Sequence, residues 1–393
     1  MLNENCTTKL FGLQGVIIKK VRENDKNIEL GVELPKHPQV CPECGCVTAR
    51  IHDYRNQKVK DMPIRNKKVI INLHKRRYVC PGCGKRFYER NEWLSRYKRM
   101  THRMIEDIFL KLKDSVSFKH VANELNISVS TVCRYFDALN IPGKALPEVL
   151  CIDEFKGNTG KNKYQCILLD GVSGEIIDIL PNRDKATLEH YFSKKNVKDV
   201  RFLVSDLWDP YFNLVQNIFP KARHIADKYH VIRQAVWSME AIRKELQKQL
   251  NTTSRIHYKH SAHLLRSSFE RMKEGKKAKL LEILSTSREL SNAYWIKEDF
   301  LNIFRCETVS EAKEAIHKWC IEASESGYGR FIQNTKMLGK WEKSIVNAIK
   351  YGYSNGKIEG TNNKIKVLKR VSYGMRNFDR FRNRILFVAY DKT

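Results

Sequence analysis

Four cysteines are spaced as two metal-binding knuckles, in the strings CPECG at 41–45 and CPGCG at 80–84. The predicted ligands are Cys41, Cys44, Cys80 and Cys83. Two C-x-x-C pairs supply four thiolates in a tetrahedron, which is the ligand set of a structural zinc ion and leaves no open position for water. The 35-residue gap between the pairs is long for a compact ribbon, so His52 or Cys46 stays an alternative ligand, and four unliganded buried thiols are the other alternative.

Two acidic residues close apolar stretches further along the chain. Asp153 ends VLCID, and Asp206 ends VRFLVSD. If these stretches are neighbouring strands of one sheet, both carboxylates reach one edge, and two converging carboxylates favour a divalent metal ion. Taken singly, each acid could equally be a strand-end or helix-cap residue. A third acid is needed to support a metal site.

The elements that would position these acids follow a linker at 141–149, IPGKALPEV, which holds two prolines and a glycine. Strands are predicted at 149–155, at 164–180 with a turn over 170–174, at 200–206 and at 222–227. Helices are predicted at 185–195 and 210–219. Three antiparallel strands followed by alternating helices and parallel strands is the order of a ribonuclease-H-like mixed sheet. From 229 to about 349 the periodicity is almost entirely helical, which predicts a large helical insertion.

The part of the chain before the linker carries features of a DNA-binding module. Residues 1–38 predict a short hairpin, and ten Lys or Arg residues lie between Lys75 and Arg103, interleaved with aromatic residues. This density of cations suits phosphate neutralisation, although a solvated face of a zinc ribbon is the alternative.

The string SFKHVANELNISVSTVCRYFDAL at 117–139 predicts two helices with a tight joint at 126–128, as in a helix-turn-helix. The residues expected in the buried seam are Val121, Leu125, Ile127, Val129 and Val132. The residues expected to face outward from the second helix, toward base edges, are Ser128, Ser130, Thr131, Arg134 and Tyr135. An ordinary helical hairpin is the competing interpretation.

Composition points to the same class of partner. The chain has 72 Lys or Arg against 44 Asp or Glu, a net charge of +28, which indicates a polyanionic partner such as nucleic acid. Hydrophobic residues make up 42%, which favours folded cores over a basic tail. The start of the chain lacks a signal-peptide pattern and no apolar run reaches a membrane span, so we expect a cytoplasmic protein without a membrane partner.

Several strings together resemble the ISL3 family of bacterial insertion-sequence transposases over nearly the whole chain. They are the two knuckles, IDEF at 152–155, SDLWDPY at 205–211, ADKYHV at 226–231 and YSNGKIEGTNNKIKVLKRVSYGMRNFDRFRNRIL at 353–386. The resemblance implies a ribonuclease-H-like catalytic domain whose acidic triad is Asp153, Asp206 and Glu359. Asp227 and His230 lie in one of the shared strings, and their role is left open.

The fold class that follows is multidomain α+β, with an N-terminal zinc ribbon and helix-turn-helix before a ribonuclease-H-like mixed α/β catalytic domain with a large all-helical insertion. The expected boundaries are 1–95 for the zinc ribbon, 96–141 for the helix-turn-helix, 142–228 for the first part of the catalytic core, 229–350 for the insertion and 351–393 for the last helices of the catalytic core, which carry the third acid.

The chemistry implied is cleavage of a phosphodiester at a transposon end and attack of the freed 3′ hydroxyl on target DNA, with two Mg²⁺ ions held by the triad. We expect double-stranded DNA, both transposon ends and target, as the partner and a homodimer on that DNA. The cations expected to contact the DNA backbone from the helix that carries the third acid are Lys357, Lys364, Lys366, Lys369 and Arg370. A solvated helix face is the alternative for them.

Two other classes compete with this interpretation. A repressor descended from a transposase would keep the DNA-binding front end but lose the acids, and all three acids are present. A ribonuclease-H-like nuclease would share the triad, and strand joining in addition to cutting would separate a transposase from it.

Overall fold

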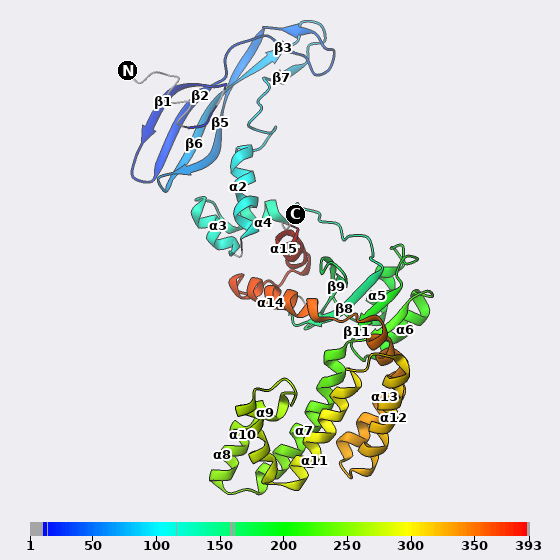
Figure 1. Ribbon diagram of the computed structural model, residues 1–393. Helices are drawn as coiled ribbons and strands as arrows, with labels where there is room; N and C mark the ends of the chain where they lie inside the picture. The colour runs from blue at the N-terminus through cyan, green and yellow to red at the C-terminus, as the bar shows by residue number, and fades with distance from the viewer. Residues whose placement is uncertain (1–10, 14, 115, 158, 160–161, 391–393) are drawn as a thin grey trace. The chain divides into compact units, whose positions relative to one another are not determined.

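The computed structural model describes residues 11–13, 15–114, 116–157, 159 and 162–390. The first ten residues, on which the expectation of no export signal mainly rests, lie outside this part. The chain divides into two compact units (Figure 1). Unit 1 comprises 1–141, 367–375 and 379–393, and unit 2 comprises 142–366 and 376–378.

Unit 1 begins with a five-stranded sheet of order β1-β2-β6-β5, with β7 paired to β6. The strands are β1 (Ile17–Glu23), β2 (Asn27–Glu33), β5 (Ile51–Ile64), β6 (Lys67–Val79) and β7 (Arg86–Tyr88). β1 and β2 form the antiparallel hairpin predicted within 1–38. Alternate apolar residues of β2 and β6 are buried together in one core, as the two-residue period of a strand requires. A short pair, β3 (Gln39–Val40) and β4 (Val47–Thr48), flanks the first cysteine knuckle.

Three helices follow, α2 (His102–Lys113), α3 (Phe118–Glu124) and α4 (Val129–Asp137). The joint between α3 and α4 falls where it was predicted, and Asn126 adopts a left-handed backbone conformation there, with φ of 53°. Val121, Leu125 and Val132 are buried as expected. The prediction for Val129 was wrong, since this side chain is 39% exposed. Val129 is the first residue of α4, whereas the residues of this helix that are buried in the core are Val132 and Phe136.

The sheet and the helices of unit 1 are tied together by polar contacts around Lys60 and Asp61. The amide of Lys60 donates to the carbonyl of Arg99, and its carbonyl accepts from the amide of Thr101, both within 3.1 Å. The buried Asp61 carboxylate accepts from the hydroxyl of Thr101 and from the guanidinium of Arg103. These contacts fix the start of α2 against β5.

The last helix of the chain, α15 (Phe378–Ala389), completes the helical part of unit 1 from residue 379 onward. The ring of Phe387 packs edge-on against Phe136 at 5.7 Å and contacts Phe109 at 6.2 Å. The buried Arg384 donates to the carbonyl oxygens of Asp114 and Val116 at 2.7 and 3.2 Å. The helix-turn-helix was expected to end at residue 141, whereas its core includes a helix from the far end of the chain.

Unit 2 contains a five-stranded sheet of order β10-β9-β8-β11-β12. The strands are β8 (Val149–Phe155), β9 (Gln165–Asp170), β10 (Ile176–Leu180), β11 (Phe202–Ser205) and β12 (Arg223–Ala226). The first three pair antiparallel, and β11 pairs parallel to both β8 and β12. The connecting helices α5 (Lys185–Phe192) and α6 (Asp209–Ile218) share a core with this sheet. The order of strands and helices predicted over 149–227 is therefore confirmed.

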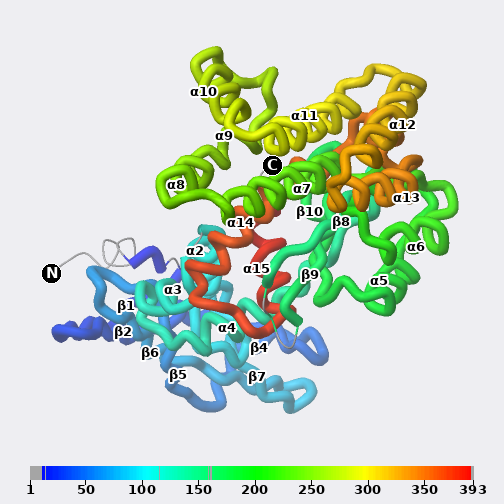
Figure 2. The backbone as a smooth tube through the Cα atoms, turned by 90° about the horizontal axis from the view of Figure 1, so that it is seen from below, coloured from blue at the N-terminus to red at the C-terminus, as the bar shows by residue number. Residues whose placement is uncertain are grey.

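A run of helices separates β12 from the last helix of unit 2. They are α7 (Lys228–Gln249), α8 (Thr252–His260), α9 (Ala262–Arg266), α10 (Glu274–Ser285), α11 (Arg288–Ile303), α12 (Val309–Glu325) and α13 (Gly329–Tyr351). Figures 1 and 2 both show α11 running alongside α7, and large side chains such as Phe300, Trp319 and Phe331 fill the core between the helices. The chain then turns at Gly352, with φ of 70°, and enters α14 (Gly356–Val371). In the part of the chain that the structure describes, no helix is both long enough and apolar enough to span a membrane.

Candidate active site and zinc centre

Three aspartates lie at the same level of three adjacent parallel strands. In the register of the sheet, Val204 pairs with Cys151 and Ser205 pairs with Ala226. Continuing each pairing past the strand end brings Asp206 level with both Asp153 and Asp227. Residues at one level of neighbouring parallel strands point to the same face. The topology thus gathers three carboxylates at the carboxyl edge of β8, β11 and β12.

Asp227 and His230 form a connected pair at the start of α7. Asp227 is buried, caps α7 by accepting from the amide of His230, and accepts from the backbone amide of Asn355 at 3.0 Å. His230 Nδ1 lies 2.7 Å from Asp227 Oδ2 and 2.6 Å from Asp206 Oδ1. One imidazole therefore connects two of the three carboxylates.

The charges at this edge perturb one another. Burial and, as the second cause, the neighbouring Asp206 carboxylate together raise the pKa of Asp153 to about 6. Burial alone would lower the pKa of His230, but its contacts with Asp206 and Asp227 outweigh that effect and raise it to about 9. A carboxyl group that resists ionisation beside other carboxylates is typical of a site that binds a cation.

Two asparagines hold the start of α14 against the same edge. Asn355 Nδ2 donates to the carbonyl of Ile152 at 3.2 Å, and Asn362 Nδ2 donates to Asp153 Oδ2 at 3.1 Å. Glu359 lies four residues after the first asparagine and three before the second, so all three share one face of the helix. Its side chain is exposed and, within the described ranges, makes no hydrogen bond or ion pair. The structure therefore brings the helical turn of Glu359 to the aspartates without a contact from its own carboxylate.

The acid next to Asp153 has a different environment. Glu154 points to the other face of the strand, where it forms an ion pair with Arg183 and accepts from the hydroxyl of Tyr211 at 3.2 Å. Its charge is already compensated. Of the two adjacent acids in IDEF, only Asp153 is directed to the cluster.

The cluster has the donor set for a hard divalent cation. Asp206, Asp227 and His230 each place one possible ligand atom within 4.8 Å of the others. Carboxylate oxygens at such an edge are the ligands that Mg²⁺ prefers. Asp153 and Glu359 do not belong to this group. The group contains Asp206, which the sequence predicted as a ligand, and Asp227 and His230, whose role the sequence left open.

Sequence reasoning missed the asparagines and the pairing of His230. Asn355 and Asn362 lie in the string YSNGKIEGTNNK, beside the predicted third acid, and that proximity was the available signal. The sequence left the role of His230 open; the structure places it at the start of α7, with its ring in contact with two carboxylates.

The cations of α14 have mixed surroundings. Lys357 donates to the carbonyl of Val172 in the turn between β9 and β10, so it is held by the sheet. Lys366 is exposed and contacts Asn363 at 3.3 Å. The remaining predicted cations of this helix are Lys364 and Arg370, which are exposed, and Lys369, which is half-buried.

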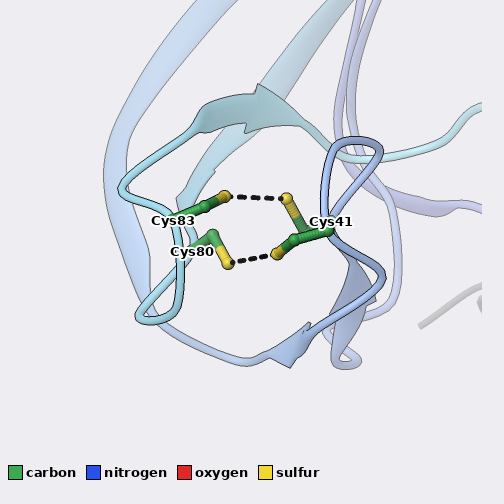
Figure 3. A group of neighbouring side chains, drawn as sticks. Cys41, Cys80 and Cys83 are labelled. Atoms are coloured by element: carbon green, nitrogen blue, oxygen red, sulfur yellow. Dashed lines mark hydrogen bonds between the residues drawn. The ribbon is translucent and has the colours of Figure 1, made fainter.

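The four knuckle cysteines come together in unit 1. Figure 3 shows Cys41 on one loop facing Cys80 and Cys83 on another. Cys41 Sγ lies 3.6 Å from Cys83 Sγ, and Cys44 Sγ lies 3.4 Å from Cys80 Sγ. A tetrahedral zinc site with Zn–S bonds of ~2.3 Å separates its sulfurs by ~3.8 Å, so the cluster fits a structural zinc ion. His52 and Cys46 are outside the group of described side chains that could hold this ion.

Each knuckle is closed by a glycine, as expected. Gly45 and Gly84 have φ of 74° and 70°, and their amides donate to the carbonyls of Cys41 and Cys80 at 3.0 Å. This left-handed turn carries no steric cost for glycine and lets backbone amides face the sulfurs. The amide of Cys83 lowers the pKa of the Cys80 thiol, which favours the thiolate that zinc requires.

The outward face of α4 is partly as predicted. Ser130 and Arg134 are exposed. Ser128 caps the helix and contacts the hydroxyls of Ser130 and Thr131 at 3.0 and 2.9 Å. Tyr135 is half-buried against the helical core, with Arg134 over its ring at 5.6 Å. Its ring is therefore less exposed than the sequence predicted.

The basic stretch between 75 and 103 divides into two groups. Arg76 is buried in ion pairs with Glu89 and Glu33, and Arg103 is bound to Asp61. These cations stabilise the fold. The exposed cations of the stretch, which stay available to a polyanion, include Arg86, Arg90, Arg96, Lys98 and Arg99.

A zinc knuckle pair, a helix-turn-helix and a mixed sheet with acids at its edge define a multidomain protein that acts on DNA. Comparison with known proteins agrees with this class in chain order. Residues 37–83 match the zinc finger of transposases IS204/IS1001/IS1096/IS1165, residues 89–140 match the helix-turn-helix domain of transposase family ISL3, and residues 150–385 match the transposase domain of that family. The chain belongs to the ISL3 family of insertion-sequence transposases.

One relative matches the chain along nearly its full length, and others match parts of it. The chain is 25% identical over 397 residues to the transposase for insertion sequence element IS1001 of Bordetella parapertussis, with 97% of each chain covered. It is 25% identical over 245 residues to the transposase for IS1557 of Mycobacterium tuberculosis, covering 55% of this chain and 54% of the relative. A stretch of 47 residues is 51% identical to part of an ATP-dependent protease of Lactococcus lactis, but it covers only 12% of the chain.

Proposed function

We propose that this transposase binds the terminal inverted repeats of its insertion sequence and catalyses metal-dependent strand cleavage and strand transfer through Asp153, Asp206 and Glu359. The observation that carries the proposal is the common level of Asp153 and Asp206 on adjacent strands, with the helix of Glu359 held against them by Asn362. The sheet order, three antiparallel strands continued by two parallel ones, supports a ribonuclease-H-like core with α7 to α13 as its insertion.

The reaction consists of two exchanges at phosphorus. Water attacks the phosphodiester at the transposon end and frees a 3′ hydroxyl. That hydroxyl then attacks a phosphodiester of the target, so one P–O bond forms as another breaks and no outside energy source is needed. Two Mg²⁺ ions held by the triad would activate the attacking oxygen and stabilise the leaving oxygen.

The residues around the triad serve to hold it in place. Asn362 orients the carboxylate of Asp153, and Asp227 fixes the start of α14 through Asn355. His230 donates its Nδ1 proton to Asp227 and lies against Asp206, which restricts the rotation of that carboxylate. The exposed cations of α14 and of the basic stretch in unit 1 would neutralise phosphates of the bound DNA.

Sequence-specific contacts in this proposal come from the start of α4, where Ser130, Thr131 and Arg134 would reach base edges in the major groove. An insertion sequence has two ends that must be processed together, so we propose a homodimer with one copy at each end. The DNA on which this transposase would act is bacterial, and we therefore propose that it acts in the cytoplasm.

The test is a strand-transfer assay with full-length protein, Mg²⁺ and a duplex that ends in the element's own terminal repeat. Wild-type protein is expected to join the 3′ end to a target plasmid, and Asp153→Asn and Glu359→Gln proteins are expected to bind the end but not join it. Cleavage without joining by the wild-type protein would favour a nuclease. Joining by both variants would refute the assigned triad.

A further inference from the structure

One face of α7 carries a ladder of two exposed aromatic side chains with a half-buried arginine between them. Tyr229 is 60% exposed and Trp237 is 52% exposed, and both are large apolar groups. Arg233 lies between them in sequence, with its guanidinium carbon 5.6 Å from the Tyr229 ring and 4.6 Å from the Trp237 ring. The spacing of four residues keeps all three on one face of the helix.

The core does not account for this face. The buried side of α7 is formed by other residues, Val231, Ala235 and Met239, which pack among the neighbouring helices. Arg233 forms no ion pair within the described ranges, and its Nε is a buried nitrogen that has no hydrogen-bond partner there. A cation held between two exposed rings without a carboxylate is arranged to meet an external group.

The ladder begins at the acidic cluster. The ring of Tyr229 packs edge-on against that of His230 at 5.7 Å, and His230 contacts Asp206. The positive charge of Arg233 acts to lower the pKa of His230, so the two side chains are close neighbours. With a rise of ~1.5 Å per residue, the ladder extends ~12 Å along α7 from this point, which is the length of a few stacked nucleotides.

We propose that Tyr229, Arg233 and Trp237 form a stacking platform for unpaired bases of the DNA strand that flanks the cleavage position. The inference rests on the proposed function of the acidic cluster. Aromatic rings stack on base faces, and arginine adds a cation–π contact and a charge for the backbone. Bases in a duplex hide their faces in the stack, so the platform selects unpaired DNA. The net charge of +28 favours a polyanion over a neutral protein partner.

The experiment measures DNA binding by the full-length protein without divalent metal ions, so that no strand is cut. One probe is the terminal-repeat duplex with a short unpaired flank that holds 2-aminopurine, and the other is the same duplex fully paired. The expected result is that Trp237→Ala weakens binding of the unpaired-flank probe about tenfold and leaves the paired probe unchanged. Trp237→Phe, which keeps a ring, is expected to restore most of the affinity and the quenching of 2-aminopurine.

The matched control is Trp295→Ala on α11, which removes another partly exposed tryptophan outside the ladder and should leave both probes unaffected. Equal affinities of wild-type and Trp237→Ala proteins for the unpaired flank would overturn the proposal. An equal loss on both probes would overturn it as well, since that loss would mean a general effect on DNA binding. No strand is cleaved in this binding assay, so its outcome does not depend on whether Asp153, Asp206 and Glu359 are the catalytic residues.

Discussion

Removing α15 should disable the DNA-binding unit, although this helix is the last in the chain. The decisive side chain is Arg384, which is 1% exposed and satisfies the carbonyl oxygens of Asp114 and Val116 just after α2. Its guanidinium also lies over the rings of Phe118 and Phe136 at 5.7 and 6.0 Å. Burial lowers the pKa of Arg384 to about 10, so the group is still charged at neutral pH.

The magnitude follows from these contacts. Leaving a buried acceptor without a donor costs about 1–3 kcal/mol, and loss of the cation–π contacts adds about 0.5–2 kcal/mol. We therefore expect Arg384→Ala to destabilise the helices of unit 1 by about 3 kcal/mol. Arg380→Ala, four residues earlier on α15, is the matched control. It removes a partly exposed ion pair with Asp137, and such pairs contribute only about 0.2–1 kcal/mol.

Hydrogen exchange read by mass spectrometry measures this effect in the intact protein. Peptides from α2 to α4 should exchange about a hundredfold faster in Arg384→Ala than in wild-type protein, because about 1.4 kcal/mol corresponds to a factor of ten. They should change little in Arg380→Ala. A protein truncated after residue 377 should lose binding to its own terminal repeat in a gel shift. If the truncated protein exchanged and bound DNA as the full chain does, the proposed role of α15 would be refuted.

Three further outcomes are expected. Cys41→Ser should release the zinc ion and abolish DNA binding, and a purified wild-type protein without zinc by metal analysis would contradict this. Arg134→Ala should weaken binding to the terminal repeat more than to random DNA, by about 1–3 kcal/mol, and an equal loss on both would make it a phosphate contact. Burial lowers the pKa of His224 to about 4, so the unfolded chain binds this proton below about 6.5 while the folded chain does not. About 3 kcal/mol of stability should therefore be lost as the pH falls from 6.5 to 4, and His224→Gln should flatten the pH dependence of the urea midpoint.

The local elements were predictable because their signals are local. The strands of unit 2 are short apolar runs bounded by turn residues; Asp153 lies two residues before the end of β8, and Asp206 directly follows β11. The cysteine knuckles carry their ligand spacing within five residues each. The joint before α4 was located because Asn126 tolerates the left-handed conformation that a tight turn requires.

The features that could not be predicted depend on contacts between residues far apart in the chain, and such contacts produce no periodic pattern in the sequence. Asp137 pairs with Arg380 across 243 positions, so the docking of α15 could not be inferred from either helix alone. The contact of His230 with Asp206 arises from the register of β11 and β12 and from the cap of α7. Arg76 belonged to a cation-rich string, and only the fold shows that Glu89 neutralises it.

The most direct test compares two acids that lie three residues apart. Asp206 is half-buried at the acidic edge, whereas Asp209 is 58% exposed at the start of α6 and pairs with Lys340 on the surface. Single-turnover cleavage of a terminal-repeat duplex with Mg²⁺ should fall about a thousandfold or more in Asp206→Asn, because a metal ligand is lost, and should be nearly unchanged in Asp209→Asn. Normal cleavage by Asp206→Asn, with or without loss in Asp209→Asn, would contradict the proposed active site.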